Sequence, residues 1–190
     1  MKKPTGPGRI RVTSGSAGGL WLKVHRDFSS RPTQDKVKQA IFSSLGDRVP
    51  GAKLLDLYAG TGSLGIEALS RGAEQVIFVE KDRVSTSTIQ ENLTYCKLQG
   101  QIINRSVETF LEQINSQLYD IILADPPYTK GVHNLSNDPV VVSLRQWIAP
   151  EGLLVWEHDS RNRWENNPHW ELAKTSAYGE SSVSYLKPIP

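Results

Sequence analysis

Two short runs of residues could carry chemistry, and the first of them is rich in glycine. It reads DLYAGTGSLG over residues 56–65, with glycines at 60, 62 and 65 between an apolar run and a helical pattern. Glycines at this spacing permit a tight strand-to-helix turn that a ligand can approach closely. Glu80 closes the next apolar run 20 residues after Gly60, where a carboxylate can accept hydrogen bonds from both hydroxyls of a ribose. The pattern predicts a nucleotide-type binding site.

The acid that opens this run bears on which nucleotide binds. A dinucleotide would place its pyrophosphate at the helix N-terminus, where the carboxylate of Asp56 would be an unfavourable neighbour. Asp56 instead suits a ligand that carries positive charge, such as the amino-acid part of S-adenosylmethionine. The run therefore favours S-adenosylmethionine over a dinucleotide.

The second run is Asp125-Pro126-Pro127-Tyr128, which directly follows the fourth apolar run. Ligands of open α/β sheets gather at the carboxyl ends of the strands. Because the two prolines stiffen the turn and lack N–H donors, the Asp125 carboxylate and the Pro126 carbonyl are fixed acceptors. Such a pair can hold both hydrogens of an exocyclic amine of a nucleobase, while Tyr128 offers an aromatic face to the unstacked base. Aligned acceptors favour the attacking geometry of the amine and stabilise the charge that develops on its nitrogen.

A parallel sheet would bring these runs together. Apolar runs typical of strands alternate with helical patterns, which favours a parallel sheet covered on both faces. We expect strands at residues 54–57, 76–80, 101–103, 120–124 and 153–157, the first four of them buried on both faces, and helices at 63–70, 83–97 and 107–115. Two further strands, at 170–174 and 182–186, should form a hairpin at the sheet edge.

The N-terminal part differs from the rest of the chain in charge and pattern. Residues 1–50 carry ten Lys or Arg and three Asp, a net charge of +7, which leaves −5 for the other 140 residues. We expect a disordered tail at 1–8, a basic β-hairpin extension at 9–30 and the main domain at 31–190. Thr33 is the expected N-cap of a helix that opens the main domain. The charge fits a polyanionic partner such as nucleic acid, and it fits a solvated basic face equally well.

Composition excludes several classes of protein. The 190 residues suit one domain, and 38% hydrophobic with 22% charged residues is typical of globular proteins. No run approaches the roughly 18 apolar residues of a membrane span, and the N-terminus lacks the apolar stretch of a secretory signal. The single cysteine, Cys96, excludes an internal disulfide, and the four histidines have no metal-ligand spacing. We therefore expect a cytoplasmic protein without a metal.

The two runs and their neighbours resemble the class I S-adenosylmethionine-dependent methyltransferases and, more closely, the RsmD family of 16S ribosomal RNA guanine-N2 methyltransferases. The resemblance extends over nearly the whole chain after residue 8. Its most specific part is EALSRGA at residues 67–73, because nothing general about cofactor binding demands that run. It also includes RPT at 31–33, VEKDR at 79–83 and YGESSV at 178–183.

The resemblance implies a Rossmann-like, seven-stranded sheet with an antiparallel last strand, and methyl transfer to the N2 amine of a guanine in small-subunit rRNA. The residues that it implies for catalysis are Asp125, Pro126 and Tyr128, with Pro127 beside the base. Those that it implies for cofactor binding are Asp56, Tyr58, Ala59, Gly60, Thr61, Gly62, Glu80, Lys81, Ser106 and Val107. The N-terminal hairpin would help to grip RNA, and the substrate contacts are Arg9, Arg11, Arg31 and Thr33.

The chain departs from the family at one of these positions. The family usually has an Asp near the adenine amine after the third strand, where this chain has Ser106. A hydroxyl accepts a weaker hydrogen bond than a charged carboxylate does. Either the affinity for the cofactor is lower, or Glu108 takes the place of the Asp.

Three other functions stay open from the residues alone. An adenine-N6 DNA methyltransferase uses the same acceptors at 125–128, but the chain has no spare length for a domain that reads duplex DNA. A nicotinamide-dependent oxidoreductase leaves the run at 125–128 unexplained. A non-catalytic RNA-binding factor on the same fold would bind without methyl transfer. The expected partner is ribosomal RNA or the small ribosomal subunit, and one compact domain with a basic arm permits a monomer.

Overall fold

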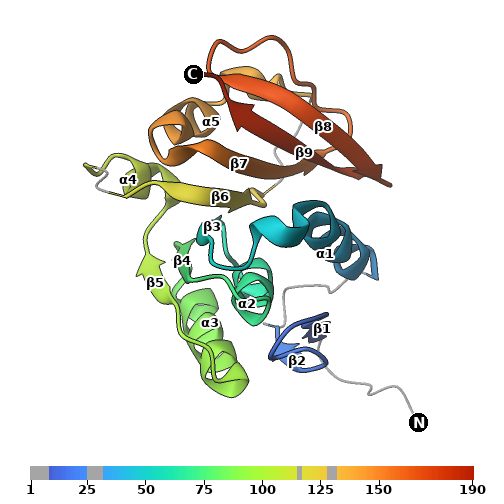
Figure 1. Ribbon diagram of the computed structural model, residues 1–190, viewed down its shortest axis with the longest axis vertical. Coiled ribbons are helices and arrows are strands. Elements are labelled where there is room, and N and C mark those ends of the chain that lie inside the picture. The colour runs from blue at the N-terminus through green and yellow to red at the C-terminus, as the bar shows by residue number, and fades with distance from the viewer. Residues whose placement is uncertain (1–8, 25–31, 115–116, 128–131) are drawn as a thin grey trace.

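A computed structural model describes residues 9–24, 32–114, 117–127 and 132–190 (Figure 1). The strands and helices, in chain order, are β1 (Arg9–Arg11), β2 (Trp21–Lys23), α1 (Pro32–Leu45), η1 (Gly46–Arg48), β3 (Lys53–Leu57), α2 (Ser63–Ser70), β4 (Gln75–Glu80), α3 (Arg83–Cys96), β5 (Gln101–Asn104), α4 (Val107–Leu111), β6 (Tyr119–Ala124), η2 (Leu135–Asn137), α5 (Pro139–Ser143), η3 (Leu144–Gln146), β7 (Ile148–Asp159), β8 (Trp170–Tyr178) and β9 (Ser181–Pro188).

Seven of the strands form one sheet in the order β5-β4-β3-β6-β7-β9-β8. The five strands from β5 to β7 are parallel to one another, whereas β9 runs antiparallel to both of its neighbours. This confirms an antiparallel last strand and a β8–β9 hairpin at the sheet edge. The chain adds β4 and β5 on one side of β3 and then returns to add β6 on the other, so the topological switch point lies between β3 and β6.

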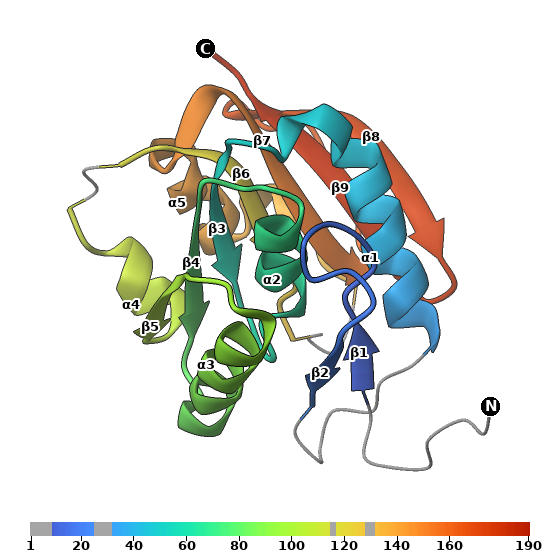
Figure 2. The ribbon, with the colours of Figure 1, turned by 60° about the horizontal axis from the view of Figure 1, so that its bottom comes forward.

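Helices cover both faces of the sheet (Figure 2). On one face α1, α2 and α3 share a core with strand residues such as Leu54 and Phe78. On the other face α4 and α5 pack around strand residues such as Leu55 and Val79. Successive side chains of a strand point to opposite faces, so a strand with two apolar cores reads as a continuous apolar run. The doubly covered, mostly parallel sheet is the expected fold class.

β1 and β2 pair antiparallel as a separate two-stranded sheet, which confirms the N-terminal hairpin. Its strands are three residues each, because residues 12–20 form a compact loop with hydrogen bonds of its own. The Val12 N–H donates to the Leu20 carbonyl at 2.9 Å, and the Gly19 N–H donates to the Val12 carbonyl at 2.8 Å. This loop lies beside α2 (Figure 2). The expected tail at 1–8 and the end of the hairpin extension after residue 24 lie outside the described residues.

Several expected elements differ from the structure. α1 begins at Pro32, so the prediction of Thr33 as the N-cap is wrong; the fixed φ of proline suits the first helical position. β5 is an edge strand with exposed or half-buried residues, so its expected burial on both faces is also wrong. α4 ends at Leu111, and β7 begins at Ile148, five residues earlier than expected.

The tryptophans of the C-terminal third contribute to packing. Trp147, Trp156 and Trp170 are buried and Trp164 is partly buried against the same core. Cys96 is buried at the end of α3, which agrees with an inert packing role. In the described part of the chain, no helix combines the length and the apolar character of a membrane span.

Candidate active site

The two runs singled out in the sequence meet at the switch point of the sheet. Leu57 of β3 pairs with Ala124 of β6, so the glycine-rich run and Asp125 leave neighbouring strands at the same level. Leu57 also pairs with Val79 of β4, which places Glu80 one residue beyond that pair. Open α/β sheets bind their ligands at this edge, outside the carboxyl ends of the strands at a switch point.

The loop between β3 and α2 depends on left-handed backbone. Tyr58, Gly60 and Gly62 have φ angles of 57°, 54° and 76°. The Gly62 N–H closes the turn on the Ala59 carbonyl at 2.7 Å. The Asn92 side chain of α3 donates to the Thr61 carbonyl at 3.1 Å. Only the left-handed conformation of Tyr58 is costly, about 1–2 kcal/mol for a residue with a side chain. Strain of this kind concentrates at functional sites.

The Glu80 carboxylate braces this loop. One of its oxygens accepts the Gly60 N–H at 2.9 Å, and the other accepts the Asp82 N–H at 2.8 Å. The Asn104 amide at the end of β5 donates to the carbonyls of Glu80 and Lys81 at 3.0 and 2.9 Å, while the Lys81 side chain is exposed. A carboxylate has about four lone-pair sites. Glu80 can therefore hold the loop and still accept two hydrogen bonds from a ligand.

Asp56 lies beneath the loop and is 1% exposed. Its Oδ2 accepts the Gly65 N–H at 2.9 Å, which ties β3 to α2. Burial raises the pKa of the Asp56 carboxyl to about 8; the Gly65 hydrogen bond opposes the rise, and the charges of Asp125 and Glu80 add to it. Asp125 and Glu80 thus both lie within electrostatic reach of Asp56, and carboxyl groups gathered in this way favour a ligand that carries positive charge.

Asp125 follows β6 directly, with Pro126 half-buried after it. Asp125 is exposed at the end of β6, yet desolvation by the protein on its other side, followed by the charge of Glu157, raises the pKa of its carboxyl to about 7. A carboxyl group with this pKa is suited to accept a proton near neutral pH. Pro127 is exposed, and Tyr128 lies outside the described residues, so its stacking role stays a prediction.

Ser106 is the N-cap of α4. Its Oγ accepts the Thr109 N–H at 3.2 Å and lies 3.2 Å from the Thr109 hydroxyl. Val107 is buried, whereas Glu108 is exposed in the first turn of the helix. Burial raises the pKa of the Tyr58 hydroxyl and the charge of Glu108 adds to the rise, so Glu108 lies within electrostatic reach of the glycine-rich loop. The contact of Ser106 or Glu108 with an adenine stays a prediction.

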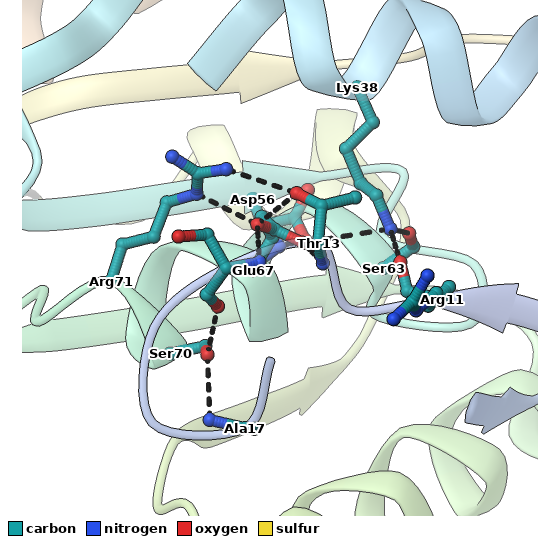
Figure 3. Close-up of polar contacts among 11 residues, drawn as sticks. Arg11, Thr13, Ala17, Lys38, Asp56, Ser63, Glu67, Ser70 and Arg71 are labelled. Carbon is teal, nitrogen blue, oxygen red and sulfur yellow. Dashed lines mark hydrogen bonds and ion pairs between the residues drawn. The ribbon is translucent and has the colours of Figure 1, made fainter. Parts of the chain in front are cut away.

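A buried charge cluster holds the N-terminal loop on α2 (Figure 3). Glu67 of α2 has no exposed surface and accepts three hydrogen bonds from the loop, from the Thr13 N–H at 2.7 Å, the Thr13 hydroxyl at 2.6 Å and the Ser14 N–H at 3.1 Å. Arg71 Nε donates to Glu67 at 2.7 Å, and Lys38 Nζ of α1 lies 3.7 Å from its other oxygen. One carboxylate thus meets two cations and the N-terminal loop.

The same cluster reaches both the hairpin and the glycine-rich loop (Figure 3). Lys38 Nζ donates to the Arg11 carbonyl at 2.6 Å and to the hydroxyl of Ser63, the first residue of α2, at 3.2 Å. Ser70 Oγ accepts the Ala17 N–H at 2.9 Å. The run EALSRGA was the most specific part of the family resemblance, but the residues alone gave it no role. In the structure Glu67, Ser70 and Arg71 of that run hold the N-terminal loop in place.

The predicted substrate residues are only partly described. Arg11 is exposed on β1, and its guanidinium lies 6.0 Å from the centre of the Trp21 ring, which is 45% exposed. Arg9 belongs to β1 and Thr33 to α1, and their side chains lie outside the described part, as does the whole of Arg31. Contact of these four residues with RNA stays a prediction.

The fold and the site together define a class I S-adenosylmethionine-dependent methyltransferase. A Thermus thermophilus 16S rRNA N2 methyltransferase, solved with AdoMet and guanosine, shares this fold, with a TM-score of 0.72 at 22% identity over 95% of this chain and 49% of that one. Among the described residues, no group of three or more metal-ligating side chains gathers in one place.

The family described as conserved hypothetical protein 95 matches residues 10–187, and the chain belongs to it; this confirms the resemblance to RsmD proteins. Ribosomal RNA small subunit methyltransferase D of Haemophilus influenzae is 33% identical, over 97% of each chain. The Escherichia coli protein of the same name is 32% identical over 95% of this chain and 91% of its own. The structure of a hypothetical protein from Thermus thermophilus superposes with a TM-score of 0.77 at 27% identity, over 94% of this chain and 99% of that one.

Proposed function

We propose that this protein transfers the methyl group of S-adenosylmethionine to the N2 amine of a guanine in 16S ribosomal RNA. The proposal rests chiefly on the sheet register that brings the glycine-rich loop, Glu80 and Asp125 to one edge. Two relatives of nearly the same length are named ribosomal RNA small subunit methyltransferase D, which supports small-subunit rRNA as the substrate. The two acceptors at Asp125 and Pro126 fit an exocyclic amine of a nucleobase, and the family resemblance favours the N2 amine of guanine among these.

The residues of the site fit S-adenosylmethionine. Glu80 has lone pairs left for the ribose hydroxyls after it has held Gly60 and Asp82. Asp56 and its carboxyl neighbours suit the amino group and the sulfonium of the cofactor, because a bound cation would favour the charged form of each carboxyl group. When bound, S-adenosylmethionine supplies a methyl group on a cationic sulfur. Ser106 and Val107 at the start of α4 would border the adenine.

Asp125 and Pro126 would present the target amine. The carboxylate of Asp125 and the carbonyl of Pro126 accept one amine hydrogen each, which directs the nitrogen lone pair away from the ring plane. The same hydrogen bonds stabilise the positive charge that develops on this nitrogen. Asp125 then receives the proton that the amine must lose, since its pKa of about 7 is matched to neutral pH. Positioning and electrostatics suffice, and no covalent bond to the protein is needed.

The N-terminal hairpin would grip the RNA backbone. It carries exposed Arg11 and half-exposed Trp21 within the part of the chain that has a net charge of +7. Cations bind phosphate oxygens, and an aromatic ring can stack on an unpaired base. Because Lys38 and Glu67 fix this hairpin to α2, RNA held by the hairpin would be held in a set position relative to the site. We propose that the chain acts in the cytoplasm, on rRNA or the small subunit, as a monomer.

Substitution of Asp125 tests this assignment. Asp125→Ala should keep the dissociation constant for S-adenosylmethionine within about twofold and lower kcat by about 100-fold or more, because it removes both an acceptor and the proton acceptor. Asp47→Ala, a matched change at an exposed acid of η1, should leave both quantities unchanged. Transfer by Asp125→Ala at near wild-type rate would refute the role of Asp125. A sedimentation mass of two chains would refute the proposed monomer.

A further inference from the structure

A second carboxylate stands next to Asp125 at the sheet edge. Ala124 of β6 pairs with Trp156 of the parallel strand β7. Asp125 is the next residue after Ala124, and Glu157 is the next residue after Trp156. Glu157 is half-buried. Its charge adds to desolvation in raising the pKa of Asp125, which places the two carboxyl groups within electrostatic reach of each other. The site therefore has an acidic partner beside the proposed amine acceptor.

The face of the sheet to which Glu157 belongs follows from alternation along β7. Val155 packs in the core under α1, α2 and α3, and Trp156 packs in the opposite core. Glu157 therefore returns to the face of Val155. Leu55 and Leu57 both point into the core that α4 and α5 cover. Asp56, which lies between them in β3, therefore points to the other face of the sheet, the face of Glu157. Glu157, like Asp56, belongs to the side of the sheet from which the glycine-rich loop enters α2.

The strand end that carries Glu157 is firmly held. Glu157 lies one residue beyond the last β6–β7 pair, and its backbone still pairs with Val183 of β9. The next residue, His158, is buried, with Nε2 2.8 Å from Ser184 Oγ and Nδ1 2.8 Å from the Asp159 carbonyl oxygen. Side chains that select a ligand need this kind of rigid support.

We propose that Glu157 makes the site specific for guanine by accepting the ring N1–H of the target base, beside the N2 amine held by Asp125 and Pro126. This inference rests on the proposed function. On the Watson–Crick edge of guanine, the exocyclic amine stands next to a ring N–H donor. In adenine and cytosine, the ring nitrogen next to the amine is an acceptor, which a carboxylate repels. The second acid would thus attract guanine and reject the other two amine-bearing bases.

Replacement of guanine by 2-aminopurine removes the N1 hydrogen together with O6, so the contact of Glu157 is measured by comparing this replacement in wild-type protein and in Glu157→Gln. 2-Aminopurine keeps the N2 amine, but its N1 carries no hydrogen. We would prepare small-subunit particles with guanine or 2-aminopurine at the methylated nucleotide and measure kcat/KM for each. Wild-type protein should prefer guanine by roughly 10- to 100-fold, the range expected for a hydrogen bond to a charged group. In Glu157→Gln the preference should fall to about threefold or less, because the amide can donate to the bare N1.

Three controls keep the outcomes distinct. Glu151→Gln, the same change at an exposed position of the same strand, should keep the wild-type preference. The dissociation constant of Glu157→Gln for S-adenosylmethionine should stay within about twofold of wild type, which would show that the site is still folded. Equal use of both bases by wild-type protein, or a full preference in Glu157→Gln, would overturn the role of Glu157. If wild-type protein methylates no guanine of the rRNA, the proposed function itself fails.

Discussion

The buried Glu67 cluster makes a quantitative prediction for the variant Glu67→Gln. Glu67 is fully buried, and every partner described for it donates to it or is a cation: Thr13, Ser14, Arg71 and Lys38. A Gln side chain has nearly the same shape but only one acceptor oxygen. Its NH₂ group would face donors on whichever side it lies, and the two cations would lose their counter-charge.

The expected cost follows from these contacts. Removal of one partner from a buried ion pair costs about 3–5 kcal/mol, since the remaining charge is left uncompensated. That is a large share of the roughly 5–15 kcal/mol that stabilises a typical domain. The Lys23–Glu91 ion pair provides a matched control, because its side chains are 74% and 53% exposed at a distance of 2.7 Å. Glu91→Gln should cost only about 0.2–1 kcal/mol.

Urea unfolding of the two variants and wild type measures this difference. With an m-value of about 2 kcal/mol per molar, Glu67→Gln should lower the midpoint by roughly 1.5–2.5 M, and Glu91→Gln by less than about 0.5 M. Amide hydrogen exchange at Thr13 and Ser14 should accelerate only in Glu67→Gln, since those N–H groups lose their acceptor. Equal midpoints for both variants, with unchanged exchange at these two amides, would refute the reasoning.

Three further predictions concern the sheet edge. Asp56 holds a proton up to about pH 8 when folded but only to about pH 4 when unfolded, so the stability that it contributes at low pH is lost as pH rises between these values. Asp56→Asn keeps an acceptor for Gly65 and cannot titrate. The unfolding free energy of this variant minus that of wild type should therefore rise by up to about 1.4 kcal/mol per pH unit from pH 5 to 7. If this difference does not change with pH, the raised pKa of Asp56 is contradicted. Glu80→Ala should weaken S-adenosylmethionine binding at least tenfold by calorimetry, and an unchanged constant would rule out the ribose contact. Gly65→Ala should cost about 1–3 kcal/mol of unfolding free energy, because its Cβ would lie 2.2 Å from Phe78 Cε1; full stability would show that the ring can move aside.

The sequence predicted the central strands well, because those strands are buried on both faces and read as continuous apolar runs. It predicted burial of 101–103 wrongly, since β5 is an edge strand and only the strand order shows this. It also missed the start of β7 at Ile148, where Pro150 and Gly152 resemble a turn. Local pattern does not report which neighbours a strand will have.

At the site, spacing along the chain predicted the glycine-rich loop, Glu80 and Asp125, because each follows directly from the end of a predicted strand. The burial of Glu67 could not be predicted in this way. Its partners Thr13 and Ser14 lie more than 50 residues away in the sequence, and a Glu with an Arg four residues later usually marks an exposed helix face. Glu157 was also missed, since its place beside Asp125 follows only from the β6–β7 register.

Methyl transfer tests the central claim most directly. Labelled S-adenosylmethionine would be offered to wild-type protein with unmethylated small-subunit particles, naked rRNA and duplex DNA side by side, and the labelled product would be digested to nucleosides. We expect label on the small-subunit rRNA, in N2-methylguanosine. Label on adenine in DNA, or S-adenosylmethionine binding without transfer to any of the three substrates, would contradict the proposed activity.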